Sequence, residues 1–303
     1  MATQLHPPKT DERHENGNAQ LYVVSTPIGN LEDLTYRASR ILKEVEVVAC
    51  EDTRRTRRLL SAIGSSARAI SCHMHKEQRC ASAVIGYLKQ GVDVAFASDA
   101  GVPAISDPGA RLVARVREAG FGVVPVPGPS SLTAALSVAG IPADTFYFGG
   151  FIPARGKERK EALQQLAMLE CTLVILESPH RILKTLEDLL HTLGNRIVFL
   201  AREMTKLHET YWYGPMSELL ERLSSHTVRG EFTLVIEGSS KGKAIKLPSG
   251  KEPAEIVAAM IHKGISVKDA AYLAAEITGM NKKEAYDIAL RVSKGMRRTR
   301  NGP

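Results

Sequence analysis

The chain has 303 residues, a length that favours about two domains over a single core. Hydrophobic residues make up 44% and charged residues 24% of the sequence, as in ordinary globular proteins, and no apolar run reaches the roughly 20 residues of a membrane helix. The formal net charge of +7 attracts polyanions, but charge alone does not decide whether the chain binds nucleic acid.

Residues 1–20 form a polar opening stretch without the apolar core of a secretory signal peptide. We interpret this stretch as a disordered extension. Together with the lack of a membrane run, it predicts a cytoplasmic protein with no membrane partner.

Between residues 21 and 142, short β-branched strands alternate with helices. Strands are expected at 21–25, 46–50, 92–96 and 123–126, and helices at 34–45, 52–63 and 132–139. This alternation is typical of βαβ units and predicts an α/β domain with a mostly parallel sheet. The breaker cluster at residues 140–143 marks its end.

A second α/β domain is predicted over residues 143–240. Its expected strands are 146–150, 172–176, 197–201, 209–213 and 231–237, and its expected helices are 157–169, 181–193 and 216–224. Residues 241–252 have the Gly, Ser and Lys content of a linker.

The last part of the chain, residues 253–303, combines helices with a basic tail. Helices are expected at 254–262, 267–278 and 282–292, with glycines at the breaks. The pattern fits a helix-turn-helix-like module, and it fits a helical cap on the second domain equally well.

The sequence contains four cysteines, Cys50, Cys72, Cys80 and Cys171. Their spacings match neither a zinc ribbon nor a dense disulfide framework, so we expect reduced thiols. His73 and His75 are two residues apart, a pattern more typical of a polar loop than of a metal site. No metal is predicted.

Three loops rich in Gly, Pro, Ser and Asp follow predicted strands of the first domain: residues 26–30, 97–109 and 127–131. Open α/β sheets bind ligands at the carboxyl ends of their strands, so the three loops predict one crevice for a small-molecule cofactor. The alternative is that these residues only turn the chain. For Asp99 two interpretations also remain: its carboxylate contacts a ligand, or it forms an Asx turn that holds its own loop.

The stretches 26–35, 51–54, 98–109, 127–131 and 149–155 together resemble the tetrapyrrole methylase superfamily, and the likeness runs in order from about residue 21 to 292. The resemblance implies a two-domain, class III methyltransferase fold, a homodimer, and S-adenosylmethionine bound between the domains. The likeness is strongest to the branch that methylates the ribose 2′-hydroxyl of a decoding-region cytidine in 16S rRNA of the small ribosomal subunit.

Two alternatives stay open: a tetrapyrrole C-methyltransferase and a non-catalytic RNA-binding protein. Val102 and Glu177 stand where the tetrapyrrole branch usually has Asp and Met, which argues against a porphyrin substrate. The resemblance places the cofactor contacts on Pro27, Asp99, Ala100, Gly101, Val102, Ile105, Ser130, Ser131, Glu177 and Met204.

A ribose hydroxyl is a weak nucleophile and benefits from a general base. The candidates are four carboxylates that follow expected strands, Glu51, Asp52, Glu177 and Glu203. His180 is a further candidate. Each carboxylate has an arginine nearby in sequence, so an ion pair is an equally good interpretation.

Guanidinium groups match the geometry of phosphate oxygens. The expected contacts to the rRNA backbone are the arginines in or beside the loops: Arg54, Arg55, Arg155 and Arg181. Arg57 and Arg58 are interpreted as solvated helix surface. No DNA partner is expected.

Overall fold

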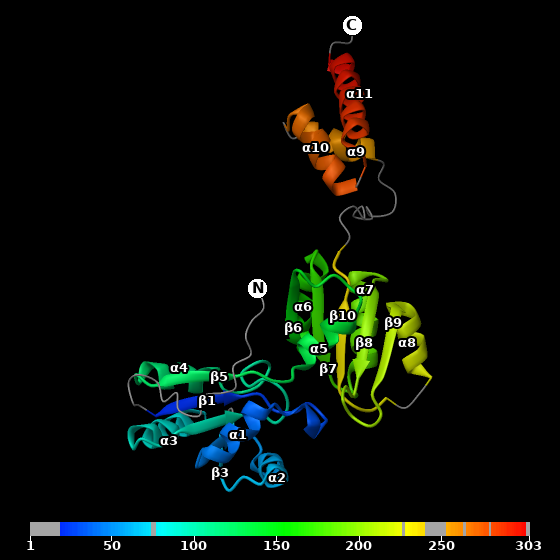
Figure 1. Ribbon diagram of the computed structural model, residues 1–303. Coiled ribbons are helices and arrows are strands. Elements are labelled where there is room, and N and C mark those ends of the chain that lie inside the picture. The colour runs from blue at the N-terminus through cyan, green and yellow to red at the C-terminus, as the bar shows by residue number, and fades with distance from the viewer. Residues whose placement is uncertain are drawn as a thin grey trace, which may run out of the picture. The chain divides into compact units, whose positions relative to one another are not determined.

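The computed structural model describes residues 19–73, 77–225, 228–239, 253–262, 265–278 and 280–300. The chain forms two compact units (Figure 1). The larger unit comprises Met1–Ala167 and Cys171–Glu237, and the smaller comprises Met168–Glu170 and Gly238–Pro303. Within the described residues, no helix is both long and apolar enough to cross a membrane.

The first sheet of the larger unit is five-stranded and wholly parallel, as the βαβ alternation predicts, with the strand order β3-β2-β4-β1-β5. Its strands are β1 (Gln20–Val24), β2 (Val47–Cys50), β3 (Arg68–Ser71), β4 (Val94–Ala97) and β5 (Gly122–Val126). Because β1 lies between β4 and β5, the loops that follow these three strands are neighbours at one edge.

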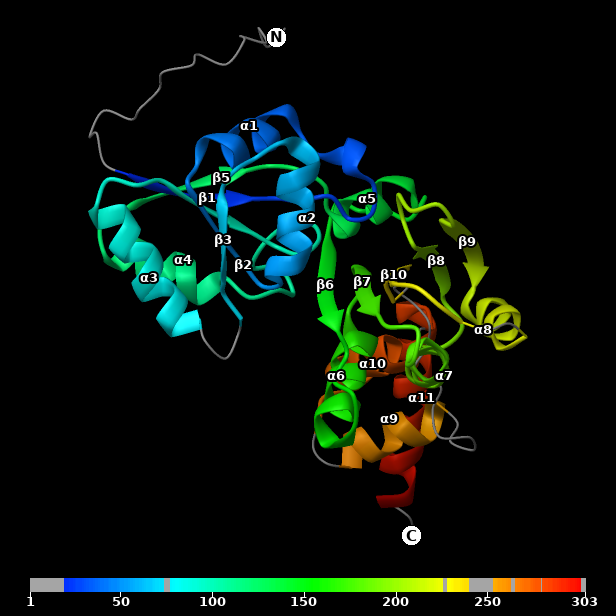
Figure 2. The same cartoon turned by 90° about the horizontal axis from the view of Figure 1, so that it is seen from below.

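Helices cover both faces of this sheet, which explains why its central strands are mostly apolar (Figure 2). One face packs against α1 (Tyr36–Glu44) and α2 (Thr53–Ile63). The other face packs against α3 (Glu77–Lys89) and α4 (Ala110–Glu118).

The second sheet is also five-stranded, in the order β6-β7-β10-β8-β9, and only its β6–β7 pair is parallel. Its strands are β6 (Phe146–Phe151), β7 (Thr172–Glu177), β8 (Ile197–Arg202), β9 (Thr210–Pro215) and β10 (Phe232–Ile236). The helices in this half are α6 (Gly156–Met168), α7 (Ile182–Leu193) and α8 (Met216–Ser224).

Helix α5 (Ser131–Val138) packs on the second sheet, although the strand-helix alternation groups it with the first. Its buried residue Ala135 shares a core with Val174, Phe199 and Val235 of the second sheet. The apolar face of α5 is evident in the sequence, but the sheet that it covers is not. The two sheets therefore belong to one compact unit.

One cysteine prediction is wrong. Cys72 and Cys80 form a disulfide between the end of β3 and α3, and their Cα atoms lie 5.3 Å apart, within the normal range for such a bridge. A single local bridge has no framework of spacings, so the cysteine pattern did not reveal it. Cys50 and Cys171 are free thiols, as expected.

The smaller unit contains α9 (Pro253–His262), α10 (Val267–Thr278) and α11 (Lys282–Arg300). These helices share a core that includes Val257, Ala270, Ala274 and Ala289. Helix α11 continues to Arg300, so the basic stretch from Lys294 to Arg300, which was expected to follow the last helix as a tail, is helical. The predicted fold class, two α/β sheets with a C-terminal helical module, is confirmed.

Candidate functional site

The loops after β1 and β4 are joined through their backbones. Thr26 and Gly101 form an antiparallel bridge, in which each amide donates to the other's carbonyl at 2.9 and 3.0 Å. The Ser98 hydroxyl also donates to the Gly101 carbonyl at 2.7 Å, and the Thr26 hydroxyl donates to the Ser98 carbonyl at 3.1 Å. The two loops therefore form one rigid, buried junction.

Gly101 holds a conformation that favours glycine, with φ at +79°. A Cβ atom there would lie 3.4 Å from the Ile28 side chain and 3.8 Å from the Pro129 carbonyl. The loops after β1, β4 and β5 thus meet around this glycine, as the sequence predicts.

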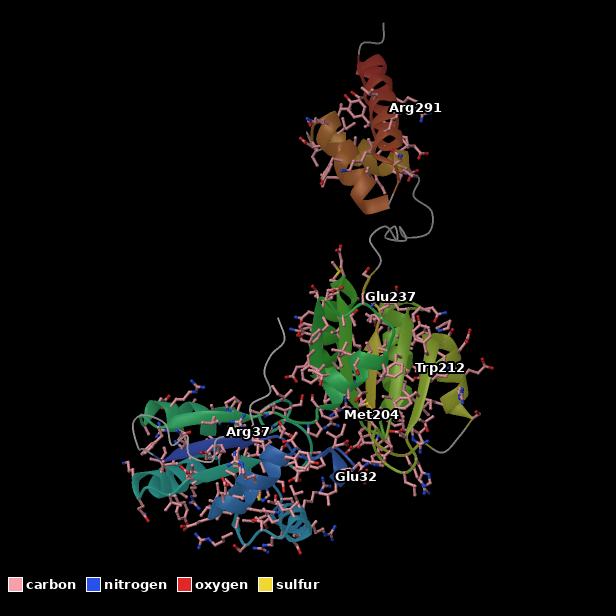
Figure 3. All side chains as sticks on the ribbon, in the orientation of Figure 1. Glu32, Arg37, Met204, Trp212, Glu237 and Arg291 are labelled. Carbon is pink, nitrogen blue, oxygen red and sulfur yellow. A yellow bond between two sulfur atoms is a disulfide. The ribbon has the colours of Figure 1, made fainter. Side chains whose placement is uncertain are left out.

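The loop after β8 approaches from the second sheet and closes the junction. A Cβ on Gly29 would lie 2.4 Å from Lys206 Cγ and 2.7 Å from Thr205 Oγ1, so the contact requires a glycine. Glu203 and Thr205 both adopt positive φ, at 54° and 66°. Met204 lies between them, buried at the end of the second sheet that faces the first (Figure 3).

Two cavities lie on either side of the β1 loop. The first, which we call the arginine cavity, has a volume of about 290 Å³ and lies between this loop, the start of the β4 loop and α2. Pro27 and Asp99, two of the predicted cofactor residues, are in its lining together with Arg55 and Arg58.

The second, which we call the α5 cavity, has a volume of about 520 Å³ and lies between the β1 loop, the β5 loop, α5 and Thr205. Ser130, a predicted cofactor residue, is in its lining. Asp33 Oδ2 and Thr205 Oγ1 also belong to residues of this lining, and both atoms are buried without a hydrogen-bond partner among the described residues. Such atoms are expected where a polar ligand binds.

The other predicted cofactor residues are spread around the junction. Val102 is half-buried behind Gly101, whereas Ala100 is exposed and Ile105 is 48% exposed. Ser131 is the first residue of α5. Met204 is buried in the core that α5 shares with the second sheet, so its side chain packs inside the fold.

Glu177, predicted both as a cofactor contact and as a base, is 1% exposed and fully engaged by its own chain. Its carboxylate accepts hydrogen bonds from Ser178 N at 2.8 Å, Thr185 Oγ1 at 2.7 Å and Arg181 at 3.0 Å. Arg181, which donates to Glu177, also donates to the Ile152 carbonyl. This network ties β7 to α7 and occupies the Glu177 carboxylate and Arg181 Nη2, whereas Arg181 Nε is buried without a hydrogen-bond partner among the described residues.

Two further candidate bases are held in ion pairs. Asp52 caps α2 and accepts from the Arg54 backbone and guanidinium, and these hydrogen bonds hold the pKa of the Asp52 carboxyl well below its usual range. Glu203 accepts from Lys206 at 2.9 Å and from Glu231 N at 2.9 Å, and the bond from Lys206 lowers the pKa of Glu203. Both carboxylates are stabilised as anions within the fold.

Glu51 differs from the other candidates. It follows β2, it is half-buried, and in the described part of the chain it accepts no hydrogen bond. Its charge acts on Asp107, in the loop after β4. Burial, followed by the charges of Glu51 and Asp99, raises the pKa of Asp107 to about 6.

Sequence reasoning missed Asp107. It belongs to residues 106–109, Ser-Asp-Pro-Gly, where an Asp before Pro-Gly is typical of a turn, and nothing in the local sequence shows that Glu51 lies nearby. The His180 side chain is exposed, and Arg155 is exposed beyond the end of β6.

A family model described as Tetrapyrrole (Corrin/Porphyrin) Methylases matches residues 20–220, and one described as RsmI C-terminal HTH domain matches residues 252–293. Ribosomal RNA small subunit methyltransferase I from Neisseria meningitidis serogroup B is 44% identical over 272 residues, which cover 89% of this chain and 92% of that protein. The chain belongs to the ribosomal RNA small subunit methyltransferase I family. The member from Escherichia coli O157:H7 is 44% identical over 285 residues, covering 93% of this chain and 98% of its own.

Solved structures share the fold of the larger unit at lower identity. A uroporphyrin-III C-methyltransferase from Thermus thermophilus is 22% identical with a TM-score of 0.53, and a cobalt precorrin-4 methyltransferase is 18% identical with a TM-score of 0.57. Each match covers 72% of this chain and 94% of the other. The larger unit of this chain therefore shares the fold of these two methyltransferases.

Proposed function

We propose that this protein transfers a methyl group from S-adenosylmethionine to the ribose 2′-hydroxyl of a decoding-region cytidine in 16S rRNA of the small ribosomal subunit. The observation that carries the proposal is the rigid junction of Thr26 and Gly101, in a chain that matches small subunit rRNA methyltransferases over about nine-tenths of its length. The tetrapyrrole enzymes share the fold but are only 18 to 22% identical.

The residues around the junction fit adenosylmethionine. Gly101 lets the backbone of its loop pack closely against Ile28 and Pro129, which line the α5 cavity, and that cavity offers oxygen atoms of Asp33 and Thr205 that no described residue pairs. Its volume of about 520 Å³ is within the usual range for sites that bind small molecules. A solved structure of the uroporphyrin-III C-methyltransferase from Thermus thermophilus holds S-adenyl homocysteine, which supports the same cofactor here.

Adenosylmethionine supplies an activated methyl group on a sulfonium, so the protein needs mainly to hold the two reactants in line. Correct positioning is worth roughly 7–11 kcal/mol in well-oriented reactions. The backbone bridge between Thr26 and Gly101, and the contact of Gly29 with the β8 loop, provide that rigidity.

Among the four predicted carboxylates, Glu51 is the one that we assign as the general base. Asp52, Glu177 and Glu203 are held by hydrogen bonds from their own chain, whereas the Glu51 carboxylate accepts no hydrogen bond from the residues that the structure describes and its charge acts on Asp107 in the β4 loop. It would accept the proton of the ribose hydroxyl as the methyl group is transferred, a role worth typically 10²–10⁴-fold in rate.

The test uses small subunits from a strain that lacks this methylation, incubated with the protein and adenosylmethionine. Nuclease digestion and mass spectrometry should show one 2′-O-methylcytidine per subunit. Glu51→Gln should lower kcat by at least roughly 100-fold with cofactor affinity unchanged. Methylation of a porphyrin precursor in place of rRNA, or RNA binding without methylation, would reject the proposal.

The C-terminal unit is proposed to orient the enzyme on rRNA. It has its own core, and the residues that line both cavities precede residue 206. A chain truncated at Gly250 should keep its adenosylmethionine affinity and lose salt-sensitive binding to subunits, because phosphate contacts release counterions. Unchanged subunit affinity with a lowered melting temperature would instead identify the unit as a structural cap.

A homodimer is part of the same proposal. The edge strand β6 exposes large apolar side chains, with Phe146 41%, Tyr147 45% and Phe151 53% accessible. An exposed edge of this kind is usually covered by a partner. Light scattering on the purified protein should give twice the chain mass of 33.0 kDa, and a single-chain mass would reject the dimer.

A further inference from the structure

The arginine cavity has a basic wall formed by one face of α2. Arg55, Arg58, Leu59 and Ala62 are all in its lining, and these positions recur every three to four residues along the helix. Arg54 and Arg57 belong to the same helix but are not in the lining. The cluster of four arginines in the sequence therefore divides into two that reach the cavity and two that do not.

Among the described residues, neither cavity arginine donates a hydrogen bond to a carboxylate, although Arg55 forms a long ion pair with Asp99. The nearest carboxylate oxygen to Arg55 belongs to Asp99 and lies 3.7 Å from Nη1, beyond normal hydrogen-bond length. Arg58 is exposed and forms no ion pair with any residue that the structure describes. Arg54, in contrast, gives two guanidinium hydrogen bonds to Asp52, at 3.1 and 2.7 Å.

The rest of the lining includes polar groups that are anchored to the junction, beside Pro27 and Leu31. Thr26 and Ser98 are buried, and the Asp99 carboxylate accepts from Asp52 N at 3.0 Å. Its second oxygen faces Arg55 and can accept from a ribose hydroxyl. A volume of about 290 Å³ lies at the lower end of the sizes of small-ligand sites and suits one sugar-phosphate segment.

We propose that the arginine cavity is the subsite for an RNA phosphodiester, with Arg55 and Arg58 on the phosphate oxygens and Asp99 on the adjoining ribose. This inference rests on the proposed function and adds to it the place where the RNA strand enters. Planar guanidinium forks pair with phosphate oxygens and carry no sequence information, so this subsite positions the strand and does not select the base. It separates the RNA site from the α5 cavity, where the cofactor is proposed to bind.

The experiment compares Arg58→Ala with Arg57→Ala, which removes the same charge from the same helix outside the cavity. Full-length proteins are titrated with small subunits at two salt concentrations, and adenosylmethionine affinity and the thermal melt are measured alongside. Arg58→Ala should weaken subunit binding roughly tenfold and reduce the salt slope by about one. Arg57→Ala should change both quantities clearly less.

Arg58→Lys is a further comparison. Its ammonium group keeps the charge but lacks the planar guanidinium, so it should restore only part of the affinity that Arg58→Ala loses. Equal effects of Arg58→Ala and Arg57→Ala would overturn the subsite, and so would a loss of adenosylmethionine affinity in Arg58→Ala. Both of those outcomes leave methylation by the wild-type protein intact. Failure of the wild-type protein to bind or methylate subunits would overturn the proposed function and the subsite with it.

Discussion

The Glu77 carboxylate accepts a hydrogen bond from the Gly109 amide at 3.0 Å, across 32 residues of sequence. It also accepts from the Leu112 amide at 3.4 Å. Gly109 is the N-cap of α4 and has no side chain to satisfy these amides, so Glu77 caps the helix from α3. The end of the β4 loop, which contains Asp107, is thereby fixed to the disulfide-bonded start of α3.

Glu77→Ala should lower the free energy of unfolding by about 1–3 kcal/mol, because the buried amides of Gly109 and Leu112 lose their acceptor. Urea titration followed by circular dichroism measures the change. Glu77→Gln is the control, since its amide oxygen can accept the same hydrogen bonds. A loss of equal size in both variants would contradict the capping role.

Gly101→Val should abolish adenosylmethionine binding in calorimetry while the fold is retained. The added side chain enters the space bordered by Ile28 and Pro129. Gly91→Val is the matched control, because Gly91 has φ +81° and open space around its Cβ position. Both variants should lose similar stability from backbone strain, about 1–2 kcal/mol. Cofactor affinity that is unchanged in Gly101→Val would reject the site.

Asp107 should make the protein less stable as the pH rises from about 4 to about 6. Its pKa is raised from 3.8 to about 6 in the folded state, so the folded chain binds the proton more tightly than the unfolded chain, and ionisation costs stability. Asp107→Asn should therefore be more stable above pH 6, by on the order of 1–3 kcal/mol, and lose this advantage near pH 4.

Urea denaturation of the wild type and Asp107→Asn at several pH values gives this comparison. A stability difference that is the same at every pH would show that folding does not raise the pKa of the Asp107 carboxyl.

Thiol titration tests the disulfide. Denatured, unreduced protein should react at two thiols, Cys50 and Cys171, and at four after reduction. Reduction should lower the free energy of unfolding by about 2–3 kcal/mol, the value for closing a short loop. Four reactive thiols without reduction would show that no disulfide forms and that all four cysteines are reduced thiols, as the sequence predicts.

The sequence predicts local structure well because strand and helix periodicity is local. The expected helix at 267–278 is observed with the same bounds, and the three Gly- and Pro-rich loops do meet at Gly101. A single parallel sheet requires that the loops after β1, β4 and β5 be neighbours once their strands are adjacent.

Contacts between distant residues were not predictable in this way. Nothing in the local sequence connects Glu77 with Gly109, or Glu51 with Asp107. The different surroundings of Arg54 and Arg58 could have been predicted, because an Asp at a helix start engages the next residues and the helical repeat groups Arg58 with Arg55.

The attachment of α5 to the second sheet determines how halves of related enzymes can be recombined. A crossover at residues 140–143, where the chain looks divisible, would pair one parent's α5 with the other parent's second sheet and mismatch Ala135 with Val174 and Phe199. A crossover within residues 127–130 keeps that core from a single parent. Because α5 is also a wall of the α5 cavity, the parent that provides the second sheet would then bring that wall of the proposed cofactor site with it.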